Sequence, residues 1–379
     1  MTSSNLNLRV FCAIFLTTFN FISADEQCSF EYNPGLITLG FNNLYTCTVF
    51  NSTEPTTKLQ NNRHWPRRTN NDVKYVQIQF DGFYQEFDQF YCFSFKNLEQ
   101  FGISGIKIQK FGSNFFKDCN NLKHISISSN GVKELPADLL LGTTILDQLD
   151  ITNNDFETLP EAIFSNLNQL THLHLDFNKI KDLPPKIFSS LTNLKLLSIR
   201  GNQITKLNPK WFENLQNLEF LQMNNNKVKE LPDNTFMYLT GLTHLEFTNN
   251  GLQTLNPNSF ENLKSLKTLY LSENDITGFP KNVFKPLENL TFLWINDNKI
   301  KTIHSDSFGM HNSLVMSGMS NNKIEAIDEK FIDNVAITNL FLFGNECIDD
   351  WIRSNDRSVF KMELKQCFEN YQPREEDEN

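Results

Sequence analysis

Residues 170–193 read LTHLHLDFNKIKDLPPKIFSSLTN, and the pattern of this stretch decides the fold because it is repeated along most of the chain. The leucine of its first position recurs in steps of 24 residues, and one step of 23 residues follows the last of these. The recurring residues are Leu98, Leu122, Leu146, Leu170, Leu194, Leu218, Leu242, Leu266, Leu290, Leu314 and Ile337. Self-similarity at such a period predicts a solenoid, in which each repeat forms one turn and the stacked turns share a continuous core.

The same few structural residues occupy fixed positions in every repeat. Leu173 and Leu175, at the fourth and sixth positions, alternate with polar residues, which predicts a half-buried strand in a parallel sheet of stacked repeats. Asparagine at the ninth position can bond the backbone where the chain leaves the strand. It recurs at Asn130, Asn154, Asn178, Asn202, Asn226, Asn250, Asn274, Asn298, Asn322 and Asn345.

Two further positions describe the side of each turn that lies opposite the strand. Phenylalanine at the nineteenth position is expected to fill that side, at Phe164, Phe188, Phe212, Phe236, Phe260, Phe284 and Phe308. Proline follows the fourteenth position at Pro136, Pro160, Pro184, Pro232 and Pro280. Because proline favours extended backbone or turns over a regular helix, we expect irregular structure there.

This pattern resembles the leucine-rich repeat family, and in particular its extracellular subclass with 24-residue repeats. The resemblance extends from about Val73 to Asn345 and covers about eleven or twelve repeats. It implies an α/β-type leucine-rich repeat solenoid with a curved parallel β-sheet on the concave face, irregular or 3-10 turns on the convex face, and disulfide-closed caps. The repeat that starts at Leu314 departs from the pattern because Ser317 replaces a core aliphatic residue.

The beginning of the chain predicts a secretory signal peptide at residues 1–24. Arg9 is the only charged residue before a short apolar run at residues 10–19, and Ala24 is a small residue at the expected cleavage site. The run is shorter than the ~20 residues that span a bilayer, so we expect a secreted, extracellular protein without membrane insertion. We assign residues 25–72 to an N-terminal cap, 73–345 to the solenoid, 346–367 to a C-terminal cap and 368–379 to an acidic tail.

The cysteines favour an oxidising compartment, because an even number remains after the predicted signal peptide. They are Cys28, Cys47, Cys92, Cys119, Cys347 and Cys367. The resemblance implies one disulfide in the N-terminal cap between Cys28 and Cys47. It implies another in the C-terminal cap between Cys347 and Cys367, around a core that contains Trp351. Cys92 and Cys119 occupy interior positions of neighbouring turns, which favours a disulfide between those turns. Asn51 and Asn289 begin sequons and are predicted glycosylation sites.

The third, fifth and seventh positions of each repeat point away from the core because neighbours along a strand face opposite sides. In the middle repeats these positions carry histidines and carboxylates, and four of the seven histidines of the chain lie there. The candidate ligand-binding residues of this zone are Asp150, His172, His174, Asp176, His244 and Glu246. A solvated polar surface without a ligand is the preferred interpretation, and a pH-sensitive protein contact or a metal site are the alternatives.

In the C-terminal repeats the same positions are apolar and aromatic. The candidate ligand-binding residues are Tyr270, Phe292, Trp294, Met316, Phe341 and Phe343, with Phe220 further upstream. Large exposed aromatic patches usually mark interaction sites, so we expect these rings to bind a partner. The alternative for Phe341 and Phe343 is that the C-terminal cap folds back over them.

Charge and motifs exclude several classes of function. The chain has 34 Lys+Arg against 44 Asp+Glu, a net charge of −10, which argues against a nucleic-acid partner. Catalytic motifs are missing from the sequence, so we predict no enzyme, no cofactor and no resident metal. The leading hypothesis is a secreted protein that binds a protein or glycan ligand through its concave sheet, in recognition such as innate immunity or cell adhesion. The alternatives are a self-associating matrix organiser similar to small leucine-rich proteoglycans, and a secreted enzyme inhibitor.

Overall fold

The computed structural model describes residues 29–32, 45–49, 74–79, 83–84, 97–105, 107–108 and 110–374. The predicted signal peptide, Cys28, Cys92, the Asn51 sequon and most of the N-terminal cap lie outside these residues. The chain divides into two compact units, Met1–Asn178 and Lys179–Asn379. None of the helices in the described part of the chain is long and apolar enough to span a bilayer.

The unit that ends at Asn178 is built on one main sheet. Its strands follow the order β1-β2-β3-β5-β7-β8-β9, and all pairs are parallel except the antiparallel pair β1–β2. The bounds are Ser29–Tyr32 for β1, Tyr45–Val49 for β2, Tyr75–Gln79 for β3, Gln100–Ser104 for β5, His124–Ser128 for β7, Gln148–Asp150 for β8 and His172–His174 for β9. The short strands β4 (Phe83–Tyr84) and β6 (Lys107–Ile108) form a second parallel pair.

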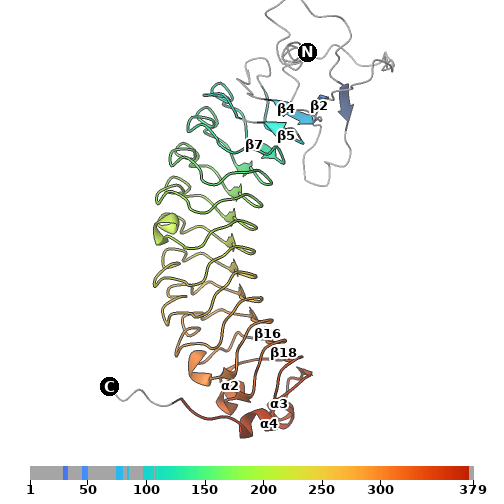
Figure 1. Cartoon of the computed structure of the whole chain (residues 1–379), viewed down its shortest axis with the longest axis vertical. Helices are drawn as coiled ribbons and strands as arrows, with labels where there is room; N and C mark the ends of the chain where they lie inside the picture. Colours follow the sequence, from blue (N-terminus) through green and yellow to red (C-terminus); the bar gives the residue numbers. More distant parts are fainter. Residues whose placement is uncertain are drawn as a thin grey trace, which may run out of the picture. The chain divides into compact units, whose positions relative to one another are not determined.

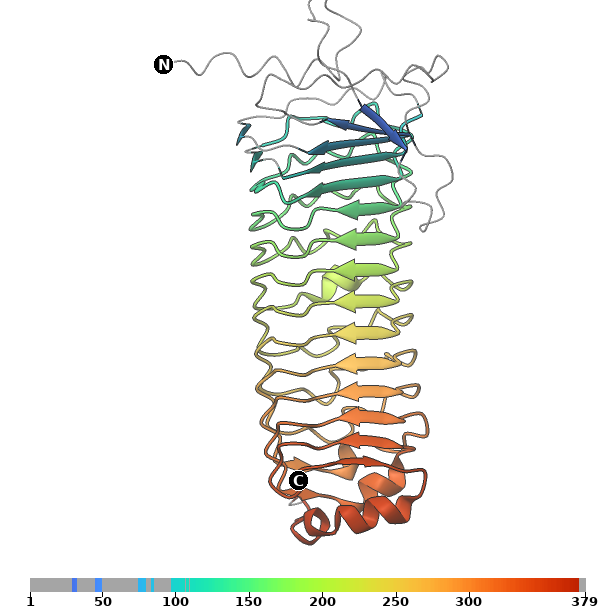
Figure 2. The ribbon, with the colours of Figure 1, turned by 90° about the vertical axis from the view of Figure 1, so that its right-hand side faces the viewer.

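The unit that begins at Lys179 continues the same architecture, with one strand in each turn (Figures 1 and 2). Parallel pairing runs through β10, β11, β12, β13, β14, β16 and β18, and β19 then pairs antiparallel to β18. The bounds are Leu196–Ser198 for β10, Phe220–Gln222 for β11, His244–Glu246 for β12, Thr268–Tyr270 for β13, Phe292–Trp294 for β14, Met316–Gly318 for β16, Asn339–Phe341 for β18 and Trp351–Arg353 for β19. We call the outer side of these strands the strand face.

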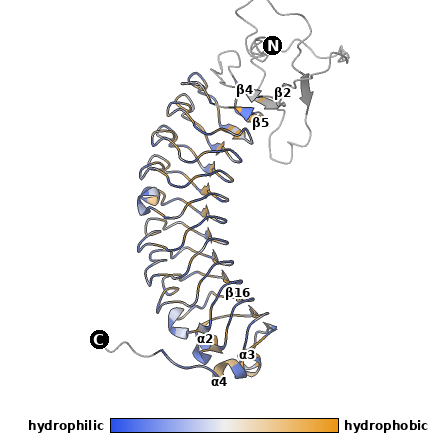
Figure 3. Ribbon diagram, viewed as in Figure 1, coloured by the Kyte–Doolittle hydropathy of each residue, from blue (hydrophilic) through white to orange (hydrophobic). Residues whose placement is uncertain are grey.

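The opposite side of this unit is mostly irregular, as the prolines predict. It contains the 3-10 helices η4 (Pro209–Phe212) and η5 (Ser305–Ser307), the helix α2 (Glu329–Asn334), and the parallel pair of β15 (Thr302–Ile303) with β17 (Ala326–Ile327). Hydrophobic and hydrophilic segments alternate along each turn (Figure 3), and the apolar residues of every turn of this unit are buried. The seven phenylalanines of the nineteenth position are fully buried, as predicted.

Asparagine side chains hold each turn to the one before it. The amide Nδ2 of Asn274 donates to the carbonyl of Phe247, 27 residues upstream, at 3.1 Å, and its Oδ1 accepts from the backbone N–H of Leu252 at 3.1 Å. The same Nδ2 also donates to Leu271 and Ser272 of its own turn. The pattern recurs at Asn226, Asn298 and Asn322. The predicted backbone role of these asparagines is therefore confirmed.

The residue before each of these asparagines turns the chain sharply away from the strand. It has a positive φ throughout this unit, at Gly201, Asn225, Asn249, Glu273, Asp297, Asn321 and Gly344. Glycine and asparagine adopt this left-handed conformation most easily, whereas glutamate does so at a cost. The turn places exposed side chains, including Glu273 and Asp297, along the carboxyl edge of the strands.

The C-terminal end of the solenoid is closed by β19 and the helices α3 (Arg357–Glu363) and α4 (Lys365–Glu369). Cys347 and Cys367 form the predicted disulfide, and Cys119 is also disulfide-bonded. Because Cys92 is not among the described residues, its pairing stays a prediction. The expected position of Trp351 is wrong: β19 buries Ile352, while Trp351 is 40% exposed on the strand face. Neighbours along a strand face opposite sides, so only one of the two side chains can enter the core.

Two polar residues replace core aliphatic residues near Leu314. Ser317 is fully buried, and its hydroxyl donates to the carbonyl of Leu293 at 3.1 Å, which satisfies the group. His311 occupies the position of a core leucine and is 1% exposed, and among the described residues neither ring nitrogen has a partner that meets hydrogen-bond geometry. Burial lowers the pKa of His311, partly opposed by the backbone of Phe284 and Phe308, so the folded state favours the neutral ring.

We predict that Asn274→Ala lowers the free energy of unfolding by about 2–4 kcal/mol, because it leaves several buried backbone groups without partners that cost ~1–3 kcal/mol each. Urea denaturation measures the change. Asn258, which is exposed, is the matched control, and Asn258→Ala is expected to change stability by less than ~0.5 kcal/mol. Equal effects of the two substitutions would contradict the role of Asn274.

We predict that His311→Leu removes part of the acid sensitivity of the fold. The pKa of His311 is lowered in the folded state, so its contribution to stability is complete above the unfolded value of ~6.5 and is lost as the pH falls below it. The free energy of unfolding at pH 7.5 and pH 5.0 is measured for both proteins. The wild type should lose up to ~1.4 kcal/mol more per pH unit than the variant, and parallel losses would contradict the prediction.

Candidate binding surface

Four aromatic rings stack across the strand face of the unit that begins at Lys179. Tyr270, Trp294, Phe341 and Trp351 occupy one row of positions, and we call this row the aromatic ladder. The ring centroids lie 6.5 Å apart for Tyr270 and Trp294, 5.9 Å for Trp294 and Phe341, and 5.4 Å for Phe341 and Trp351. The planes of the three pairs differ by 7°, 27° and 6°. The ladder is therefore a continuous apolar ridge across five strands.

Gly318 makes the ladder continuous. It lies between Trp294 and Phe341 in the strand register, so a side chain there would separate the two rings. A Cβ atom at Gly318 would lie 2.4 Å from Cε3 and 2.7 Å from Cζ3 of Trp294. The indole ring of Trp294 thus fills the space above the Gly318 backbone, and the missing side chain allows the contact with Phe341.

Other predicted aromatic residues surround the ladder without joining it. Phe292 and Phe343 are 37% and 46% exposed, and Met316 is half-buried. In the described part of the chain, no ring contact is recorded for Phe292 or Phe343. Phe220 stacks on His244 with centroids 4.5 Å apart, in the same row as Phe292 and three strands upstream of it. The C-terminal cap does not cover Phe343, and it extends the row of Phe341 with Trp351.

Glu246 lies in the row of the ladder, directly beside Tyr270. Its Oε1 accepts from Nε2 of Gln222 at 3.0 Å, and its Oε2 accepts from Nδ2 of Asn224 at 2.6 Å. Burial lowers the pKa of the neighbouring His244, against the opposing effect of the Glu246 carboxylate. The neutral ring is therefore favoured, and two amides hold the carboxylate of Glu246 on the strand face.

The other candidate histidines and carboxylates, His172, His174, Asp150 and Asp176, lie in the unit that ends at Asn178. His172 and His174 are half-buried on β9, and Asp150 of β8 is opposite His174 in the register. Asp150 accepts hydrogen bonds from the Ser126 hydroxyl and from the backbone of Thr152. Asp176 is 2% exposed, contrary to the expectation that it points to solvent, and its carboxylate lies 4.0 Å from Nδ1 of His174.

These polar side chains are not gathered into a metal centre. Among the described residues, there is no group of three His, Cys, Asp or Glu side chains placed to hold an ion. Asp150 is engaged by Ser126 and Thr152, and the burial of Asp176 leaves little of its carboxylate for a partner. The histidine zone therefore offers a polar surface, and its role in binding stays a prediction.

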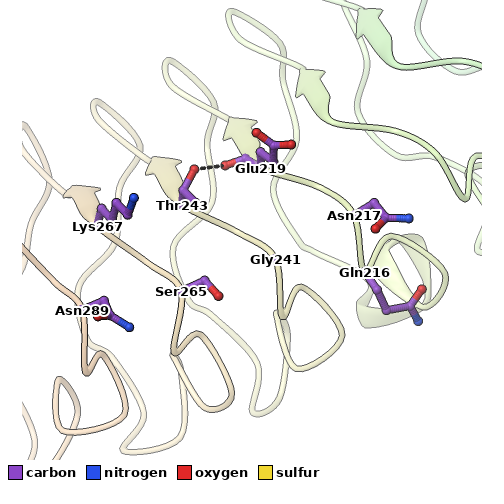
Figure 4. Close-up of a pocket in the computed structure, with 8 residues that line it drawn as sticks. All are labelled: Gln216, Asn217, Glu219, Gly241, Thr243, Ser265, Lys267 and Asn289. Carbon is purple, nitrogen blue, oxygen red and sulfur yellow. Dashed lines mark hydrogen bonds between the residues drawn. The ribbon is translucent and has the colours of Figure 1, made fainter.

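A groove of about 530 Å³ follows the amino edge of the strands in the unit that begins at Lys179 (Figure 4). Its lining residues are Gln216, Asn217, Glu219, Gly241, Thr243, Ser265, Lys267 and Asn289. Asn289, which begins a predicted sequon, is exposed, and its Nδ2 donates to the carbonyl of Lys264 at 2.8 Å. A glycan on Asn289 would start in this polar groove, three residues before β14 begins at Phe292.

Sequence reasoning missed two members of the site. Trp351 was assigned to the cap core, although the alternation Trp351-Ile352-Arg353 contains the signal for a strand with a buried centre. Gly318 has no side chain that could suggest a function from the sequence. Its role follows from its position between the rings of Trp294 and Phe341. Strand pairing decides the neighbours of both residues: parallel pairing places Gly318 beside Trp294, and the antiparallel pair of β18 with β19 places Trp351 beside Phe341.

The chain was compared with family models, curated proteins and solved structures. A model described as leucine rich repeat matches residues 120–180, 168–228, 221–276 and 264–316, which together cover more than half of the chain. A search of the curated proteins finds no match.

Several solved structures share the fold. A Toll–Spatzle complex of Drosophila is 21% identical with a TM-score of 0.63, covering 73% of this chain and 38% of that one. The TLR13–ssRNA13 complex is 22% identical with a TM-score of 0.58, covering 73% and 37%. An octameric complex of Latrophilin 3, Unc5D and FLRT2 is 18% identical with a TM-score of 0.50, covering 61% and 78%. This chain thus aligns with less than two fifths of the length of the Toll and TLR13 chains.

We predict that Gly318→Ala breaks the ladder, because the added methyl group would overlap the ring of Trp294. Near-ultraviolet circular dichroism and tryptophan fluorescence should both change, while the far-ultraviolet spectrum keeps its shape. Gly278→Ala is the matched control, since a Cβ at Gly278 meets no atom within 4 Å. Identical spectra for the two variants would show that Gly318 does not position Trp294.

Proposed function

Because this chain belongs to the leucine-rich repeat family, we propose that it is a secreted recognition protein that binds another protein through the strand face around the aromatic ladder. The predicted signal peptide, the disulfide of Cys347 with Cys367 and the predicted sequons support an extracellular setting. The solenoid offers a broad face rather than a closed pocket, which suits a macromolecular partner and not a reaction that excludes water.

The aromatic ladder is the observation that carries this proposal. Its rings stack on one another, so they present their edges to the outside, together with Phe292 and Met316 of the neighbouring row. In the described part of the chain, no hydrogen bond is recorded for the hydroxyl of Tyr270 or for the indole N–H groups of Trp294 and Trp351. Aromatic residues that combine an apolar body with an unused polar atom are typical of protein-binding hot spots.

The size of the ladder fits a protein contact. Adjacent strands lie ~4.8 Å apart, so five strands carry the ladder over about 19 Å. A standard interface buries ~800 Å² on each partner, and the ladder with its neighbouring apolar residues would form its dry centre. The polar row on the carboxyl side of the ladder, which includes Asn224, Asn296 and Ser320, would form part of the rim.

The structural neighbours support a binding role through their fold alone. Toll is solved with Spatzle, and FLRT2 is solved with Latrophilin 3 and Unc5D, so chains of this fold are found in protein complexes. TLR13 is solved with a single-stranded RNA, so the fold gives no support to our exclusion of nucleic acid. The net charge of −10 is the reason to favour a protein, because nucleic-acid binding depends on cationic contacts to phosphates.

Further aspects of the function are also part of this proposal. We infer a non-catalytic protein, with specificity contributed by the polar zone of His172, His174 and Asp150. The matrix-organising and inhibitory alternatives would use the same strand face, and no contact in the described residues favours either of them. We also propose that Asn289 carries a glycan, which would limit how a partner approaches the amino edge of the strands.

We predict that Trp294→Ala weakens binding of the partner by about tenfold to a hundredfold, because truncating an aromatic hot spot costs ~2 kcal/mol or more. The partner is first captured from extracellular fluid with the wild-type protein, and its affinity is then measured by calorimetry. Thermal unfolding of the variant checks that the fold is kept.

Met310→Ala serves as the control, because the Met310 side chain is 69% exposed and lies outside the strands that form the strand face. It is expected to bind as tightly as the wild type. A Trp294→Ala protein that folds and binds with unchanged affinity would refute the proposed binding surface.

A further inference from the structure

The carboxylate of Glu246 is held in place but is not neutralised. Both of its oxygens accept hydrogen bonds from the uncharged amides of Gln222 and Asn224. No lysine or arginine lies within 4.0 Å of it in the described part of the chain, in contrast to Glu219, which is paired with Lys195. The two amides orient the carboxylate and leave its negative charge and its remaining lone pairs available.

The neighbours of Glu246 leave one side open to a cation. Burial lowers the pKa of His244 on the same strand, so that its ring favours the uncharged form. Tyr270 is directly opposite Glu246 in the register and stacks on Trp294 with its other side. A group that contacts the carboxylate from outside would therefore also contact the ring of Tyr270.

We propose that Glu246 and Tyr270 form a subsite for a basic side chain of the protein partner, with arginine as the best fit. This inference rests on the proposed function and names the chemistry of the partner. A guanidinium can donate charge-assisted hydrogen bonds to the carboxylate and lie against the ring of Tyr270. The partner then carries an arginine beside the apolar side chains that cover the ladder.

The net charge of the chain favours the same partner. Exposed carboxylates and exposed cations both lie near the ladder, the former at Glu273, Asp297, Asp349 and Asp350, the latter at Lys267, Lys299, Lys323 and Arg353. The chain as a whole has a net charge of −10, which attracts basic segments and accelerates their encounter with the protein.

A peptide-display experiment tests the inference. A phage library of random 16-residue peptides is selected on the wild-type protein, and the binders are sequenced. We expect enrichment of arginine, with lysine second, next to aromatic or aliphatic residues. The affinities of the strongest synthetic peptides are then measured for the wild type and for Glu246→Gln, Glu230→Gln and Trp294→Ala. Glu230→Gln is the matched control because Glu230 is exposed on the turn away from the strand face.

The expected result is a loss of about tenfold or more for Glu246→Gln with arginine peptides, and no loss when the peptide arginine is replaced by glutamine. Binders without basic residues, no binders at all, or equal affinity for Glu246→Gln and Glu230→Gln would overturn the inference. Binders that lack basic residues but are lost with Trp294→Ala would overturn the inference and leave the proposed function intact. Binders that are indifferent to Trp294→Ala would overturn the proposed function itself.

Discussion

The bond between an asparagine amide and the backbone of the preceding turn is the interaction on which this structure depends. A solenoid has no single centre, and each turn is stable only if its polar backbone is satisfied where the chain leaves the strand. Asn274 meets this need with one side chain, because it accepts from Leu252 and donates to Phe247 in the turn before. The leucines and phenylalanines then fill the core between turns that the asparagine hydrogen bonds hold together. Register and packing are therefore set together in every repeat.

That fixed register is also the source of the candidate binding surface. Residues 24 positions apart become neighbours on adjacent strands, so a row of aromatic residues at one repeat position becomes a stack of rings. Gly318 lies in the same row between Trp294 and Phe341. Because it has no side chain, the space between the two rings stays open and they can stack on each other. The antiparallel strand β19 then adds Trp351 to the end of the ladder. The cap thus contributes to the strand face as well as closing the core.

The carboxylates on the strands differ in their burial and in their hydrogen-bond partners. This difference distinguishes carboxylates with a structural role from those that can bind a partner. The Asp176 side chain is buried and lies close to His174 of the same turn, so we assign it a structural role. Glu246 is held by two amides of the neighbouring turn and remains charged beside an aromatic ring. A carboxylate oriented by neutral donors loses little freedom when it binds a cation, which is the property a recognition site needs.

The sequence by itself determined the repeat, the strands, the asparagine contacts, the buried phenylalanines and the disulfide of the C-terminal cap. Each of these follows from residue type at a fixed position, because the period of the chain brings equivalent positions together. The tertiary structure decided what the period does not encode. It decided that Ile352 and not Trp351 enters the core, that Asp176 is buried, that Gly318 lets two rings meet, and that the described residues hold Glu246 through two amides and not through a cation. These outcomes depend on which side chains from neighbouring turns compete for the same space, and that competition exists only once the turns are stacked.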